Sequence, residues 1–396
     1  MKIPARWLAI GLFVFSSALN YLARNLLPAL AEPIRGEFNW SYTEYALLGS
    51  YFAFVYALSA PLMGLLIDRI GLTRGVTLAV GGWSLATIGT GISSGVTALI
   101  SSRLALGVTQ AGGIPASGKA MATYLEPSER ALGNSLSQAG ISIGSIAAPL
   151  LAAAIAPDHG WRAAFWVAGL LGFVWIPLWW LTARTAPVQP VSASETRTEL
   201  GAMLRSVTYW GLVIATMLGM TVYSLWANFT TIYFVRTFGL ESAVANRAYS
   251  WIPPLIGGFG GITGGLLSLR LIRNGGKPAS TRRLVTLAGA ILVAFTTALA
   301  PLASTPLLAA LLIGISNFSA ALLSVNLYAL PIDIFGRERA AFNIASLTCA
   351  FGLMYFFFSI WIGRMLDTQQ GFQPICWAAA IMPLIGVGVL YLTKER

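Results

Sequence analysis

The chain is a succession of long apolar stretches separated by short polar segments, and this pattern decides what it can fold into. Only 10% of its residues are charged, whereas a soluble globular domain carries about 25%. So few charges cannot cover a water-facing surface, and most of the exterior must therefore face lipid. A helical crossing needs about 20 apolar residues. The composition indicates a many-span helical membrane protein and argues against a nucleic-acid-binding protein, a Rossmann core or a secreted disulfide scaffold.

Charged residues and Gly/Pro clusters divide the apolar runs into twelve predicted spans. They lie at about residues 7–31, 43–67, 75–94, 97–124, 131–155, 162–184, 207–235, 246–272, 284–302, 305–332, 340–363 and 373–392. The first run is longer than the apolar region of a signal peptide, so we expect an uncleaved span. We predict an all-α membrane protein with two pseudo-symmetric six-helix bundles, residues 1–184 and 207–396, joined by a polar cytoplasmic linker, 185–206.

The distribution of Lys and Arg among the short loops predicts the orientation of the chain. If the N-terminus is inside, seventeen of the 25 basic residues lie on the cytoplasmic side and five lie outside. An excess of this kind marks the cytoplasmic face. We therefore expect an inner (plasma) membrane protein with both termini in the cytoplasm, and the net charge of +11 then reflects topology more than ligand binding.

Two sequence segments recur between the halves. GLLIDRIG (Gly64–Gly71) recurs loosely as GLLSLRLI (Gly265–Ile272), and ERALGNSL (Glu129–Leu136) recurs as ERAAFNIA (Glu338–Ala345). Both copies keep the same predicted membrane orientation. Parallel repeats of this kind are typical of secondary transporters, whose site lies between the repeats.

The three remaining basic residues, Arg24, Arg103 and Lys119, fall inside predicted spans, while all fourteen acidic residues lie in loops or at span ends. A charge at a span centre costs about 2.5–3.5 kcal/mol on insertion scales. A water-filled cavity that binds an external anion would offset this cost, and the planar guanidinium of arginine suits a carboxylate. The sequence therefore predicts an anion site at Arg24 and Arg103.

Each of these basic residues also has a structural interpretation. The Arg24 side chain can extend to the outer interface, although Asn20 and Tyr21, one turn away, favour a polar cavity. Arg103 can bind backbone carbonyls, and Gln110 shares its helix face. Lys119 points away from Arg103 on a straight helix, so we expect it to reach the cytoplasmic interface.

The loop after the second span carries Gly64-x-x-x-Asp68-Arg69-x-Gly71-x-x-Arg74. Glycines permit a tight turn there, and Asp68 can cap a helix or pair across the halves with Arg337 or Arg339. We predict a cytoplasmic gate that includes Asp68, Arg69, Arg74 and Arg337. The alternative is that these charges only determine topology.

The sequence offers no catalytic or metal-binding set. One histidine, His159, and two late cysteines, Cys349 and Cys376, give neither a nucleophile–base–acid arrangement nor a metal spacing. The second half instead contributes amides and aromatic residues, such as Asn343 in the eleventh span, which can contact a substrate or join helices. We expect no enzyme activity and no cofactor.

Several segments resemble a known family. The two six-span halves with G-x-x-x-D-R-x-G resemble the major facilitator superfamily over essentially the whole chain. NYLAR (Asn20–Arg24), the stretch from Arg103 to Ala131 and GWRAAFWVAG (Gly160–Gly169) resemble the anion:cation symporters, which include sugar-acid and hexuronate transporters. This resemblance implies alternating access, with Tyr21, Arg24 and Arg103 at the substrate carboxylate.

Two positions depart from that family. Ala23 stands where the family commonly has Asp, and Gln110 stands where it commonly has Glu. The resemblance implies that those carboxylates carry the coupling proton, and neither Ala nor Gln titrates. Our hypothesis is that the chain exchanges anions or lets them run downhill. The alternative is that the substrate, Glu44 or His159 carries a proton.

We therefore predict a secondary active or facilitative transporter of a small organic anion, a sugar acid or another carboxylate. The predicted substrate-binding residues are Asn20, Tyr21, Arg24, Tyr56, Arg103, Gln110 and Asn343. The expected partners are the anion, a coupling proton or counter-anion, and the lipid bilayer, without nucleic acid, and we expect a monomer. Multidrug efflux is the alternative, although cationic drugs favour an acidic residue inside the membrane. A non-transporting receptor or scaffold fits less well, because no loop exceeds about twenty residues.

Overall fold

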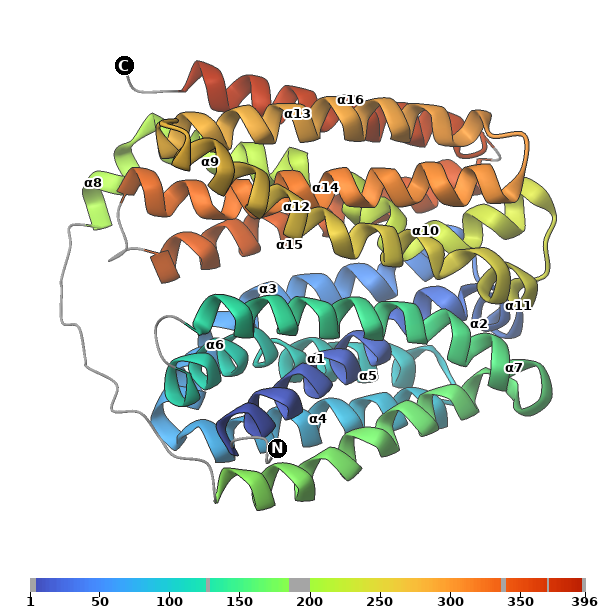
Figure 1. The fold of residues 1–396 in the computed structure, drawn as a ribbon. Helices are drawn as coiled ribbons and strands as arrows, with labels where there is room; N and C mark the ends of the chain where they lie inside the picture. The colour runs from blue at the N-terminus through green and yellow to red at the C-terminus, as the bar shows by residue number, and fades with distance from the viewer. Residues whose placement is uncertain (1–4, 126–128, 185–199, 336–339, 369, 394–396) are drawn as a thin grey trace. The chain divides into compact units, whose positions relative to one another are not determined.

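The computed structural model describes residues 5–125, 129–184, 200–335, 340–368 and 370–393, and within these ranges the chain is helical and contains no strand (Figure 1). The N-terminal helices are α1 (Ala5–Ala29), α2 (Ala31–Phe38), α3 (Tyr42–Ile70), α4 (Leu72–Ile92), α5 (Val96–Gln110), α6 (Gly113–Tyr124) and α7 (Arg130–Ala183). The later elements are α8 (Leu200–Arg205), α9 (Val207–Gly219), α10 (Thr221–Phe238), α11 (Ser242–Ala245), the π-helix η1 (Asn246–Ser250), α12 (Ile252–Arg273), α13 (Pro278–Leu299), the 3₁₀-helix η2 (Ala300–Leu302), α14 (Pro306–Phe335), α15 (Ala340–Asp367) and α16 (Gln373–Leu392).

Ten helical segments of the described chain are long and apolar enough to cross a membrane. One of them, Leu136–Ala183, contains two crossings, because Gly160 (φ 74°) divides α7 into two arms. Helices α5 and α6, of 15 and 12 residues, cover the fourth predicted span, 97–124. The prediction of an all-α membrane protein is confirmed, while the count of twelve crossings stays a prediction.

The outward-facing side chains of these helices are apolar. On α3, for example, Leu62 is 66% exposed and Leu65 is 68% exposed. Large apolar groups at this exposure are costly in water. Their exposure agrees with an exterior that faces lipid.

The helices form two compact units. The first comprises Met1–Trp40, Leu47–Ala193 and Glu241–Trp251, and the second comprises Ser41–Ala46, Ser194–Leu240 and Ile252–Arg396. The first turn of α3 thus belongs to the second unit, and α11 with η1 belongs to the first. In the first unit, the Asn246 side-chain amide donates to the Ala29 carbonyl oxygen at 2.6 Å. The sequence pattern did not predict this assignment of the two short segments.

Small residues bring the helices of the first unit into close contact. Helices α1 and α4 lie along α7 (Figure 1). A Cβ atom at Gly140 would lie 2.4 Å from the Val14 carbonyl oxygen, and one at Gly144 would lie 2.1 Å from the Ala18 carbonyl oxygen. Glycines four residues apart let two helix backbones approach in this way. The close approach fixes α1 against α7.

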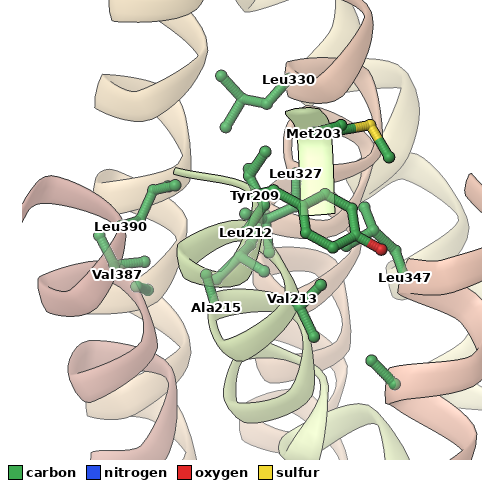
Figure 2. Close-up of a cluster of buried hydrophobic side chains, with 13 residues drawn as sticks. Met203, Tyr209, Leu212, Val213, Ala215, Leu327, Leu330, Leu347, Val387 and Leu390 are labelled. Atoms are coloured by element: carbon green, nitrogen blue, oxygen red, sulfur yellow. The ribbon is translucent and has the colours of Figure 1, made fainter. Parts of the chain in front are cut away.

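The second unit has an apolar core at one end of its helices (Figure 2). Tyr209 and Leu212 of α9 pack there with Leu327 of α14, Leu347 of α15 and Leu390 of α16. These side chains are at most 4% exposed. The cluster joins α9 to three helices that follow about 90 or more residues later in the sequence.

The structure corrects the placement of Arg283, which we expected in a cytoplasmic loop. Arg283 lies in α13 and is only 6% exposed. It shares a helix face with Ala279 and Leu287, at i−4 and i+4, which pack against the core of the second unit. The helix begins earlier than predicted because Pro278 occupies its first turn, where a missing N–H costs nothing.

Candidate functional site

Arg24 of α1 is surrounded by three aromatic rings within the first unit. Its guanidinium carbon lies 4.8 Å from the ring centroid of Tyr21, 4.9 Å from that of Phe52 and 4.6 Å from that of Tyr56. Each cation–π contact contributes about 0.5–2 kcal/mol, depending on desolvation. We call Tyr21, Phe52 and Tyr56 the aromatic cage.

Helical spacing produces this cage. Tyr21 lies three residues before Arg24 on α1, and Phe52 lies four residues before Tyr56 on α3, so each pair shares one helix face. Arg24, Tyr21 and Tyr56 are half-buried, whereas Phe52 is buried. The cation is thus set among aromatic faces and is only partly enclosed.

Gln110 connects Arg24 to the backbone of its own helix. The Arg24 Nε donates a hydrogen bond to Gln110 Oε1 at 3.2 Å, and Gln110 Nε2 donates to the Asn20 carbonyl oxygen at 3.0 Å. The second bond fixes the orientation of the amide, because only the side-chain oxygen can accept from the arginine. Gln110 is 1% exposed, so a buried, neutral acceptor orients the guanidinium.

The sequence places Gln110 beside α1 by interrupting the helix at that point. Helix α5 ends at Gln110, and α6 begins at Gly113 with Pro115 in its first turn. Proline lacks the amide that a continuous helix needs. A Cβ atom at Gly113 would lie only 3.2 Å from the Asn20 side-chain nitrogen, so the glycine permits this close approach to α1.

A hydrogen bond to α7 holds the residue next to Arg24. Asn25 Nδ2 donates to Ser145 Oγ at 3.0 Å. Together with the Gly140 and Gly144 contacts, it keeps this face of α1 in place. We did not predict either Asn25 or Phe52 from the sequence. An aromatic pair at i and i+4 on the second span is a signal that could have pointed to Phe52.

Arg103 lies apart from the aromatic cage. It is 2% exposed, its Nη2 donates to Thr90 Oγ1 at 3.3 Å, and its guanidinium carbon lies 5.3 Å from the ring centroid of Phe165. These contacts join α5 to α4 and to the second arm of α7. Its burial favours the structural interpretation. Direct contact of Arg103 with a substrate stays a prediction.

Lys119 binds the loop motif of the first half. Its Nζ donates to Asp68 Oδ1 at 2.7 Å and to the Ile67 carbonyl oxygen at 3.2 Å. This corrects the expectation that the basic residues in the spans have no acidic partner, while pairing of Asp68 with the second half stays a prediction. Lys119 reaches the end of α3, as expected for a residue that extends to the interface.

The cytoplasmic gate stays a prediction. Arg69 and Arg74 are exposed on α3 and α4, and Arg337 lies outside the described residues. Asn343 belongs to α15, but its side chain is likewise outside the described part. In the second unit, the Tyr355 hydroxyl donates to the Asn228 side-chain oxygen, which joins α15 to α10.

The comparison with known proteins gives the family. Residues 13–359 match the sequence model of the Major Facilitator Superfamily. The chain belongs to this superfamily. It is therefore a multi-pass membrane transporter and not an enzyme, and the predicted resemblance is confirmed.

Curated relatives cover most of the chain. The hexuronate transporter of Escherichia coli strain K12 is 26% identical over 410 residues, which is 99% of this chain and 94% of the relative. The galacturonate transporter of Dickeya chrysanthemi is 25% identical and covers 67% of this chain and 81% of its own length. A probable sulfoacetate transporter of Cupriavidus necator is 25% identical, over 98% of this chain and 93% of its own length.

A solved structure supports the fold. A bacterial homologue of the human lysosomal transporter Spinster, crystallised in an inward-facing and occupied conformation, has a TM-score of 0.79 to this chain. It is 18% identical, with 99% of this chain and 97% of that one covered. At this identity the likeness establishes the fold alone.

Proposed function

We propose that this protein is a secondary transporter of a small organic anion, a sugar acid or another carboxylate. The observation that carries the proposal is Arg24, a half-buried arginine inside a predicted span, held by an aromatic cage and by a neutral amide. Arginine binds a carboxylate through two parallel N–H groups. The similarity to the hexuronate and galacturonate transporters supports the same substrate class.

The transport step we propose is alternating access of the two halves of the chain. An anion that neutralises Arg24 reduces the cost of enclosing the cation, and this favours closure around the occupied site. Asn20, Tyr21, Tyr56 and Gln110 then shape or orient the site. Both termini face the cytoplasm in this proposal, as the loop charges predict.

We further propose that the protein does not use the usual carboxylate proton carriers. Ala23 and Gln110, at the two positions where the resemblance implies acids, are each 1% exposed, and neither side chain titrates. Glu44, one alternative carrier, accepts a hydrogen bond from the Ser41 backbone amide at 2.8 Å. His159, the other, is exposed next to the Gly160 break. Anion exchange or downhill flux is the mode that these features support.

Ligand-induced thermal stabilisation of the detergent-purified protein tests the substrate class. A ligand that binds only the folded state raises the melting temperature by mass action. The panel contains sugar acids, other carboxylates, neutral sugars and cationic drugs. We expect stabilisation by carboxylates that Arg24→Ala removes and that Arg273→Ala, a change of an exposed arginine on α12, retains. Stabilisation by cationic drugs alone would replace the proposal with multidrug efflux.

Uptake into proteoliposomes tests the coupling. We expect an internal anion of the same class to accelerate uptake, and we expect an imposed proton gradient to leave the uptake rate unchanged. Saturable uptake that a proton gradient drives above equilibrium would show proton symport instead.

A further inference from the structure

Of the three basic residues predicted inside spans, the structure leaves one in a position to meet a ligand. Lys119 is bound to Asp68 at the end of α3. Arg103 is almost fully buried between α4, α5 and α7. Arg24 is half-buried and lies among polar and aromatic groups. Of the three residues, Arg24 is therefore the one that the described part of the chain leaves within reach of a ligand.

The acidic residues do not alter this charge. In the described part of the long helices, Glu44, Asp68, Asp333 and Asp367 lie within three residues of a helix end, and Asp158 lies beside the break at Gly160. Each of these positions is at an end of a predicted span. In the described part of the chain these acidic residues therefore lie at span ends, and the charge that we assign to the Arg24 site is that of the arginine.

The groups around Arg24 are unfavourable for a second negative charge. The faces of aromatic rings carry the negative part of the ring quadrupole, and three such faces lie within 4.9 Å of the guanidinium carbon. Gln110 also presents its carbonyl oxygen to the arginine. An anion that brings two charges neutralises Arg24 with the first and places the second in a medium of low dielectric constant, where an uncompensated charge is costly.

We propose that the Arg24 site selects organic anions with one negative charge over anions with two. This inference rests on the proposed function and adds a charge rule to it. It assigns the selectivity to the single accessible cation and to the aromatic cage, which neutralises no second charge. Sugar acids with one carboxylate satisfy the rule, whereas aldaric acids and dicarboxylates do not.

The test compares matched pairs that differ by one carboxylate. The pairs are galacturonate with galactarate, lactate with malate, and methanesulfonate with sulfoacetate. Thermal stabilisation of the purified full-length chain at pH 7 gives an apparent Kd for each anion. In every pair that binds, we expect the monoanion to have an apparent Kd at least tenfold below that of the dianion.

A charge variant of the same site provides a second readout. Gln110→Glu places a carboxylate next to Arg24 and lowers the fixed charge of the site to zero, so we expect the apparent Kd of the monoanion to rise at least tenfold. Gln110→Met is the matched control, because it has a similar size and retains the charge. It should retain the preference for the monoanion. If either variant fails to fold, the wild-type ratios still decide the question.

The possible outcomes separate this inference from the proposed function. Equal or tighter binding of the dianions by the wild type would overturn the charge rule, while anion transport would stand. The absence of stabilisation by every anion, together with stabilisation by neutral or cationic compounds, would overturn both. A monoanion affinity that Gln110→Glu leaves unchanged would show that the anion binds to groups other than Arg24.

Discussion

The carboxylate of Asp367, the last residue of α15, caps the first turn of α3 through Thr43. Asp367 Oδ2 accepts hydrogen bonds from the Thr43 backbone amide at 3.0 Å and from the Thr43 hydroxyl at 2.6 Å. The other oxygen, Oδ1, accepts from the Tyr42 amide at 2.7 Å. Both partners belong to the second unit. A negative charge at this position also stabilises the positive end of the helix dipole.

A local capping box completes the start of α3. The Ser41 amide donates to Glu44 Oε2 at 2.8 Å, and the Glu44 amide donates to Ser41 Oγ at 3.1 Å. The two systems together satisfy four consecutive backbone amides, which a helix N-terminus leaves without partners. Two of these four amides thus bond to side chains next to them in the sequence, and the other two bond to a residue more than 300 positions away.

Replacement of Asp367 by alanine should destabilise the protein by about 1 kcal/mol, the usual cost of losing a helix cap. Asp367→Asn retains one acceptor oxygen, so its stability should lie between that of the wild type and that of Asp367→Ala. Scanning fluorimetry of the detergent-purified variants measures the effect, and hydrogen exchange at Tyr42 and Thr43 locates it. Unchanged exchange at these two amides in Asp367→Ala would contradict the assignment.

The ion pair between Glu37 of α2 and Arg162 predicts that the protein loses stability in acid. The Arg162 side chain donates to both oxygens of Glu37 at 2.6 Å, and the guanidinium lowers the pKa of the Glu37 carboxyl below its ordinary value. Because the folded state has the lower pKa, the stabilisation is complete above the ordinary Glu pKa, about 4.3, and is lost as the pH falls through the lowered value.

The pH dependence can be isolated with Glu37→Gln. We expect the melting temperature of the wild type to exceed that of this variant from pH 7 down to about pH 5, and the difference to shrink at lower pH. Glu32→Gln, on the same short helix, serves as a control for the general effect of a removed carboxylate. A constant difference between wild type and Glu37→Gln throughout the acid range would refute the role of this ion pair.

The close contact at Gly144 predicts that no larger side chain fits at this position between α1 and α7. A methyl group there would lie 2.1 Å from the Ala18 backbone oxygen, so Gly144→Ala must force the helices apart. Overpacking of this kind costs about 1–3 kcal/mol. The shift would also move α1, and with it Arg24, so the stabilisation by bound anion should fall as well. Gly11→Ala on α1, where a Cβ atom meets nothing within 4 Å, should leave both quantities unchanged.

Arg24 and Arg103 should respond differently to substitution. Arg24→Lys retains the charge but loses the planar fork and its stacking, so the anion affinity should fall at least tenfold with little change in stability. Arg103→Met should lower the melting temperature while the remaining folded protein binds the anion within about threefold of wild type. Affinity is read from ligand titrations at a temperature where both variants are folded. A large loss of affinity in a stable Arg103→Met would place Arg103 in the site after all.

The sequence predicted the parts of this structure that depend on local pattern. Hydropathy predicted twelve spans, because a segment that crosses lipid must be a continuous apolar helix. The sequence predicted one site from Asn20, Tyr21 and Arg24 because the three residues lie within little more than one helical turn. Gln110 was included because it shares a helix face with Arg103, yet its contact is with Arg24.

The contacts that the sequence did not predict all depend on how helices pack. Phe52 approaches Arg24 only because α3 lies against α1 in one rotational setting, and hydropathy does not specify that rotation. Lys119 and Asp68 are 51 residues apart, and their pairing needs α6 to end near the end of α3. Arg283 was assigned to a loop because an arginine normally ends an apolar run, and only the packing of α13 shows that it lies on a buried face.

The amide of Gln110 has a genetic consequence. Its two codons, CAA and CAG, each become a glutamate codon by one change at the first base, so a single point mutation introduces an ionisable group beside Arg24. The Asn20 carbonyl oxygen accepts from the Gln110 amide, and it could accept from a glutamic acid at this position only while that acid is protonated. On our proposal, a lineage with this fold can therefore gain or lose proton coupling by one nucleotide substitution, with the fold unchanged.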